Sequence, residues 1–140
     1  MSSVAKKLTL GKNERLKSRK QIEQLFSKGK SFSVTPLRAY YLFDHRQWTL
    51  NNGLRFGVGV SGKNFRKAVE RNRIKRLVKE ATRLQKNELL EKLKEKNVSM
   101  NVFFIYTGRE LPEYKLVFSK VGVILNKLVK LVDENAFTNS

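Results

Sequence analysis

The sequence predicts an α+β fold in which helices pack on a mixed β-sheet as a two-layer sandwich. The chain has 140 residues, which fits one domain. It is 40% hydrophobic and contains nine phenylalanines, enough apolar material for a packed core. The spacing of apolar residues alternates between the helical and the strand period, which predicts the order αββ(β)αβα. We expect residues 1–140 to form a single domain, with residues 1–12 and 134–140 flexible.

A first helix is predicted over residues 18–29. Ser18 is followed three residues later by Gln21, which is a capping-box signature, and Gly29 supplies a C-terminal stop. One face of this helix is apolar and carries Ile22, Leu25 and Phe26.

Two strands should follow the first helix. Residues 32–43 are rich in aromatic and branched side chains, and residues 54–60 alternate as Leu-Arg-Phe-Gly-Val-Gly-Val. The turn signal Asn51-Asn52-Gly53 comes just before the second run. We expect the two strands to pair antiparallel, and Trp48 to Leu50 either to extend a strand or to add a short one.

The second half of the chain predicts a long helix, a strand and a last helix. From about Lys67 apolar residues recur at intervals of three and four, and this pattern runs on through Leu93. Residues 98–106 are apolar enough for a buried strand. Residues 108–112 break the chain before a final helix over 113–132.

The charge of the chain points to a polyanionic partner. The formal net charge is +18, and residues 6–30 and 62–86 together carry 15 of these net charges. There are no cysteines, so a disulfide framework and a thiolate metal site are excluded. No apolar run approaches the roughly 18–20 residues that span a bilayer, and the N-terminus lacks the apolar segment of a secretory signal. We expect a soluble, cytoplasmic protein that binds no membrane.

The basic segment 62–86 should form one surface of the long helix. A helical wheel started at Ile74 places Leu77, Val78, Ala81 and Leu84 on the core side and leaves the opposite side nearly free of acidic groups. Arginine suits bidentate contact with phosphates, and an asparagine between two arginines can contact a sugar or a base edge. The basic side carries Asn72, Lys75, Arg76, Lys79, Arg83 and Lys86, with Arg71 and Arg73 at its borders.

The run Val-Glu-Arg-Asn-Arg-Ile-Lys-Arg-Leu-Val-Lys-Glu-Ala, residues 69–81, resembles the Arg-Asn-Arg signature helix of the bacterial ribonuclease P protein component. It follows a strand that ends Gly-Val-x-Val-Ser, as in that family. The resemblance extends over most of the chain. It departs from the family at Arg66-Lys67, where a Gly-Asn pair is usual, which predicts a differently shaped loop, and at Ile22, where an aromatic residue is frequent.

The resemblance implies a fold like domain 2 of ribosomal protein S5, with a left-handed βαβ crossover. It also implies a subunit that binds the catalytic ribonuclease P RNA and precursor tRNA and promotes removal of the 5′ leader. The RNA would require magnesium, while we predict no cofactor on the protein and no particular metal position. The residues implied to bind the ribozyme RNA are Lys63, Arg66, Lys67, Arg71, Asn72, Arg73, Lys75, Arg76, Lys79 and Arg83.

A separate cleft is implied for the single-stranded leader, which requires stacking platforms and positive charge. Its residues would be Phe26, Arg38 and either Tyr40 or Tyr41. Strand alternation sends the two tyrosines to opposite faces, so only one should line the cleft. The resemblance favours Tyr41, and Phe26 is equally suited to the core.

We predict no catalytic residue in the protein itself. His45 is the only histidine, which excludes a two-imidazole ribonuclease mechanism, and Asp44 and Asp133 are the only aspartates. Two other functions would also explain the positive charge of the long helix. One is a ribosomal or assembly protein that binds structured RNA, and the other is a DNA-binding module that places the basic helix in a major groove.

Overall fold

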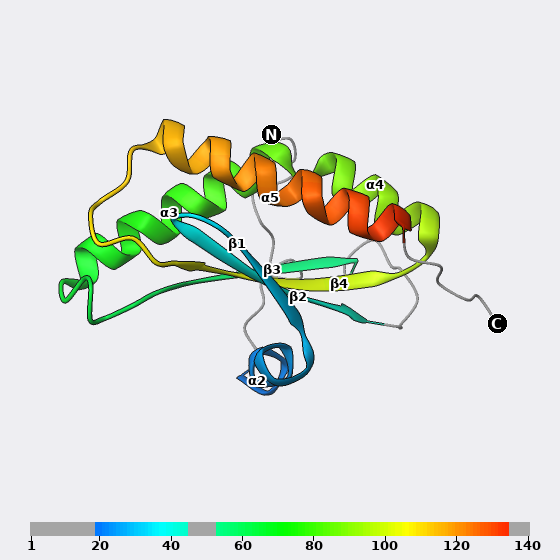
Figure 1. Ribbon diagram of the computed structural model, residues 1–140, viewed down its shortest axis with the longest axis horizontal. Coiled ribbons are helices and arrows are strands. Elements are labelled where there is room, and N and C mark those ends of the chain that lie inside the picture. Colours follow the sequence, from blue (N-terminus) through cyan, green and yellow to red (C-terminus); the bar gives the residue numbers. More distant parts are fainter. Residues whose placement is uncertain (1–18, 45–52, 135–140) are drawn as a thin grey trace, which may run out of the picture.

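The computed structural model describes residues 19–44 and 53–134, and it contains a four-stranded sheet with helices on both faces (Figure 1). Figure 1 shows α3, α4 and α5 along one face of the sheet and α2 on the other. The elements are α2 (Arg19–Lys28), β1 (Lys30–Val34), β2 (Leu37–Asp44), β3 (Leu54–Val60), α3 (Ala68–Gln85), α4 (Asn87–Lys96), β4 (Ser99–Tyr106) and α5 (Tyr114–Glu134).

The predicted strand over residues 32–43 is two strands. A two-residue turn at Thr35 and Pro36 separates β1 from β2, and the strands form an antiparallel hairpin in which Val34 pairs with Leu37. Proline has no backbone N–H to donate, so it interrupts a ladder and is well placed in a turn. The expectation of one continuous strand is therefore wrong.

The predicted pairing of the two strands on either side of residues 44–53 is also wrong. The strand order is β1-β2-β4-β3, so β4 lies between β2 and β3. It pairs antiparallel with β2 and parallel with β3. β4 is buried over most of its length. Such an apolar strand suits a central position, because there it has a neighbouring strand on each edge.

The predicted long central helix is broken at Lys86. The backbone there has φ −79° and ψ −13°, away from the usual helical ψ near −42°. Helix α4 starts at Asn87, a residue of lower helix propensity, and buries Leu89 and Leu93. Because the chain bends at this point, Lys86 is only 6% exposed, and the prediction that it lies on the basic side of the helix is wrong.

The main core fills the space between the sheet and α3, α4 and α5. Leu37, Ala39 and Tyr41 of β2 point into it, as strand alternation requires. On the opposite face, the fully buried Leu25 of α2 packs outside this core cluster. The residues that α5 buries are Val117, Val121, Ile124, Leu125, Leu128 and Val132.

The α+β class and the mixed sheet are confirmed, and α2, β3, β4 and α5 lie within two residues of their predicted bounds. The hand of the crossover stays a prediction, as does the single domain. Residues 1–12, 135–140 and Trp48 to Leu50 lie outside the described residues. Within residues 19–44 and 53–134, no helix is long and apolar enough to cross a bilayer.

Candidate nucleic-acid interface

Helix α3 carries two different faces along its length. Ile74, Val78 and Ala81 are fully buried against the sheet and α5, as the wheel predicts. Since this apolar contact orients α3, the residues on the outer side of the helix face away from the core. We call that outer side the basic face, and its exposed members are Asn72, Arg73, Arg76 and Lys79.

Arg71 supports the loop before α3. Its guanidinium donates hydrogen bonds of 2.8 Å to the backbone carbonyls of both Phe65 and Arg66. These two bonds join the first turn of α3 to the loop over residues 61–67. Arg71 is half-buried and already engaged, so the structure gives it a positioning role, while Lys63, Arg66 and Lys67 of the loop are exposed.

The loop rests on the segment that follows β4. The ring of the buried Phe65 lies 6.0 Å from that of Tyr106, and the Asn64 amide donates to the Gly108 carbonyl at 3.3 Å. The Tyr106 hydroxyl in turn donates to the Glu110 carbonyl at 2.6 Å. Burial raises the pKa of Tyr106, and the Glu110 carboxylate adds to the shift. A Cβ on Gly108 would approach the Tyr106 hydroxyl to 2.5 Å, so only glycine fits there.

Arg83 is the predicted RNA contact whose charge is already compensated. It forms an ion pair with Glu80 one turn earlier on α3. This hydrogen bond raises the pKa of Arg83 above its already high value, although desolvation opposes the shift. A paired guanidinium offers less to a phosphate than an unpaired one. Lys75, another predicted contact, is half-buried at the edge of the basic face.

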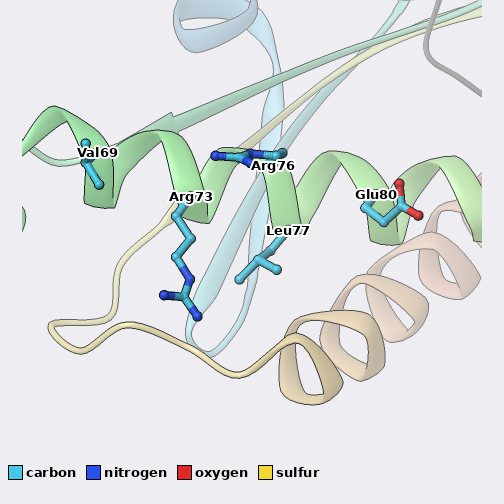
Figure 2. Close-up of a pocket in the computed structure, with 5 residues that line it drawn as sticks. All are labelled: Val69, Arg73, Arg76, Leu77 and Glu80. Atoms are coloured by element: carbon cyan, nitrogen blue, oxygen red, sulfur yellow. The ribbon is translucent and has the colours of Figure 1, made fainter.

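A hollow of about 450 Å³ lies on the basic face, lined by apolar and charged side chains (Figure 2). In Figure 2, Arg73 and Leu77 project to the same side of α3. The helical wheel places both Leu77 and Leu84 on the core side. In the structure Leu77 is half-buried and Leu84 is 49% exposed, so the prediction is wrong for Leu84. The full lining is Val69, Arg73, Arg76, Leu77 and Glu80.

The other face of the sheet carries an aromatic group next to α2. The Phe26 ring meets Tyr40 edge-on at 4.8 Å and Phe103 edge-on at 5.4 Å, and Phe26 remains 43% exposed. The Arg38 guanidinium lies 5.4 Å from the centre of the Tyr40 ring and donates to the Ser31 hydroxyl at 3.1 Å. The structure therefore brings together three of the four residues predicted for the leader, and we call Phe26, Tyr40 and Phe103 the outer aromatic group.

Tyr41 is not part of this group, and the preference for it over Tyr40 is wrong. Its side chain is 8% exposed and points into the main core, where its ring lies between those of Phe32 and Phe43. Burial raises the pKa of Tyr41. Strand alternation explains why Tyr41 faces the core and Tyr40 does not. Arg38 and Tyr40 share one face of β2, while Tyr41 shares the other face with Leu37 and Ala39.

The sequence interpretation missed Phe103 and the glycine beneath it. A Cβ on Gly59 would lie 3.0 Å from the Phe103 ring, so the absence of a side chain at this position makes room for the ring on the outer face. The sequence of β4 contains no signal for this, because Val102, Phe103 and Phe104 are all apolar. Only the structure shows that Val102 and Phe104 are buried while Phe103 between them is half-buried.

Comparison with known proteins decides the family. The family model described as Ribonuclease P matches residues 10–129. The chain belongs to the ribonuclease P protein family. One relative, the ribonuclease P protein component of Porphyromonas gingivalis, is 36% identical over 130 residues, which cover 93% of each chain. The protein component of Clostridium perfringens is 32% identical over 117 residues, covering 82% of this chain and 85% of the relative.

Solved structures of the ribonuclease P protein family share the fold. The RNase P protein of Staphylococcus aureus matches with a TM-score of 0.62 at 19% identity, covering 81% of this chain and 94% of that one. The RNase P protein of Thermotoga maritima matches with a TM-score of 0.52 at 23% identity, covering 89% and 99%. At such low identity these matches support the architecture alone.

The unusual Arg66-Lys67 pair of this ribonuclease P family member is accommodated at the surface. Both side chains are exposed, and the Arg66 carbonyl accepts one of the two hydrogen bonds from Arg71. Lys67 provides the N-cap of α3 in an extended conformation without a side-chain hydrogen bond. The pair therefore adds two positive charges beside the N-terminus of α3, where the helix dipole is also positive.

Proposed function

We propose that this chain is the protein subunit of ribonuclease P and binds the catalytic RNA through the basic face of α3 and the loop over residues 61–67. The observation that carries the proposal is the pair Arg73 and Arg76. Both side chains are exposed one turn apart, and neither has a hydrogen-bond or ion-pair partner within residues 19–44 and 53–134. Such guanidinium groups suit bidentate contact with RNA phosphates.

The outer aromatic group would contact the 5′ leader of precursor tRNA. Bases of a single strand stack on exposed rings irrespective of sequence, and a nearby guanidinium attracts the backbone. Phe26 and Tyr40 supply ring surface, and Arg38 lies beside Tyr40. The basic face and the outer aromatic group lie on opposite sides of the sheet, so ribozyme and leader would use different surfaces (Figure 1).

Endonucleolytic removal of the leader is then the chemistry of the RNA and its magnesium ions, with the protein as a non-catalytic subunit that stabilises the active complex. Within the described ranges, no three His, Cys, Asp or Glu side chains gather in a way that could hold a metal ion. In this proposal the chain contributes binding and positioning of the two RNAs.

Reconstitution tests the proposal. The full chain is combined with a ribonuclease P RNA transcript from Porphyromonas gingivalis, whose own protein component is 36% identical, and leader removal from precursor tRNA is measured at low magnesium. We expect the chain to stimulate cleavage strongly. No stimulation, together with copurification with ribosomal subunits, would favour a ribosomal role instead. Equal affinity for duplex DNA and precursor tRNA would favour a DNA-binding module.

A further inference from the structure

The hollow on the basic face differs from a simple phosphate-binding surface because its floor is apolar. Val69 is 77% exposed although it stands among charged residues, and Leu77 lies two turns further along α3. Exposing a valine side chain to water is unfavourable, and a valine side chain makes no favourable contact with a phosphate. The apolar floor therefore fits a part of a ligand that is itself flat and apolar.

The sides of the hollow are cationic. Arg73 and Arg76 line it, and neither guanidinium is engaged by another described residue. Figure 2 shows Arg73 and Leu77 side by side below the helix, so that charge and apolar surface are offered together. Charge complementarity selects an anionic partner over an apolar peptide, because a neutral side chain would leave both arginines without a counter-charge.

Glu80 closes the far end of the hollow. Its carboxylate is paired with Arg83, so its charge is partly compensated and repels a phosphate less. Eleven residues separate Glu80 from Val69, which is about 16 Å along a helix, so one base that lies on Val69 does not reach the carboxylate. The hollow therefore gives no preference among the four bases.

We infer that this hollow is a pocket for one unpaired base of the ribozyme RNA, with the base on Val69 and its flanking phosphates on Arg73 and Arg76. The inference rests on the proposed function and deepens it. The proposed function requires only phosphate contacts from the basic face, and the inference adds contact with a base. An extruded base is also a means of fixing the register of the protein on the RNA.

The test uses Val69→Ser in the full chain, with Val123→Ser as its matched control. Val123 is 49% exposed on α5 and does not line the hollow, so the second variant makes the same chemical change elsewhere. Both positions are exposed, and we expect both variants to keep the wild-type unfolding midpoint. The probe is the Porphyromonas gingivalis ribonuclease P RNA transcript. Affinity is measured together with chemical modification of unpaired bases, by dimethyl sulfate for adenine and cytosine, kethoxal for guanine and a carbodiimide for uracil.

We expect the wild-type chain and Val123→Ser to protect one unpaired base from modification. With Val69→Ser that base should become reactive again, and affinity should fall roughly fivefold through loss of the apolar contact. If Val69→Ser binds and protects as the wild type does, the inference is overturned while the proposed function stands. If the wild-type chain binds this RNA no more tightly than it binds mature tRNA, the proposed function fails, and the inference fails with it.

Discussion

The α3 side and the α2 side of the sheet both expose arginine and apolar surface, but they arrange them differently. On the α3 side, Arg73 and Arg76 have no described partner and flank an apolar hollow. On the α2 side, Arg38 is engaged by Ser31 and the Tyr40 ring, and the aromatic rings contact one another. The first side offers charge and the second offers ring surface. Under the proposed function, two chemically distinct parts of RNA would therefore bind on opposite faces of one sheet.

The support beneath each side also differs. The basic face is supported by α3, which buries Ile74, Val78 and Ala81, and by the loop over residues 61–67, which is held by the Arg71 hydrogen bonds and by contact between Phe65 and Tyr106. The outer aromatic group combines Phe26 of α2 with Tyr40 and Phe103 of the adjacent strands β2 and β4, and Gly59 leaves room for the Phe103 ring. Its rings contact one another, whereas Arg73 and Arg76 of the basic face share only the helix backbone.

The largest expected effect comes from replacing both Arg73 and Arg76 by alanine. We expect affinity for ribonuclease P RNA to fall roughly 10- to 100-fold, and the salt dependence of binding to weaken by about two units, one for each lost phosphate contact. Titration of the RNA at several salt concentrations measures both quantities. The control is Lys115→Ala with Lys130→Ala, which removes two exposed charges from α5. An equal loss in the control would mean that total charge, and not the basic face, determines affinity.

Tyr40→Ala should act on the substrate and leave ribozyme binding unchanged. If a leader base stacks on Tyr40, affinity of the assembled complex for precursor tRNA should fall by about 1–3 kcal/mol, with mature tRNA unaffected. Tyr41→Phe is the matched control, because Tyr41 faces the core and its ring is kept. A comparable loss for mature tRNA would assign Tyr40 a structural role.

Arg71→Ala should lower stability more than it lowers contact with RNA. The substitution removes two hydrogen bonds to backbone carbonyls and frees the loop over residues 61–67, which we expect to cost about 1–2 kcal/mol in the free energy of unfolding. Urea denaturation measures the change. Unchanged stability with strongly weakened RNA binding would instead make Arg71 a direct contact.

The smallest expected effect is a loss of stability at high pH. The pKa of Tyr106 is raised in the folded state, so its contribution is fully present below the ordinary value of 10.0 and is lost as the pH rises through the folded value. The free energy of unfolding should therefore fall above about pH 10, and it should fall less steeply in Tyr106→Phe. Parallel curves for wild type and variant would contradict this account of the support beneath the basic face.

Local patterns predicted the elements better than their pairing. The apolar period predicted α2 and α5. The wheel identified Ile74, Val78 and Ala81 as core residues of α3, but it placed the exposed Leu84 with them and missed the buried Thr82. The central place of β4 was not predictable, because a parallel partner across two helices leaves no local signal. Pro36 is a turn signal in the sequence, and it marks the turn between β1 and β2. Hydrogen bonds from Arg71 and the ion pair of Arg83 depend on tertiary placement, so the sequence could not separate them from the unpaired Arg73 and Arg76.

The division of labour between the two sides is tested most directly by one measurement on the assembled complex. Affinities for precursor tRNA and for mature tRNA are compared using wild-type protein, Tyr40→Ala and the Arg73→Ala, Arg76→Ala variant, with ribozyme RNA kept saturated by protein. We predict that only Tyr40→Ala reduces the preference for the leader-bearing substrate, while the arginine variant keeps that preference once assembled. Loss of leader preference in the arginine variant, with Tyr40→Ala unaffected, would contradict the account.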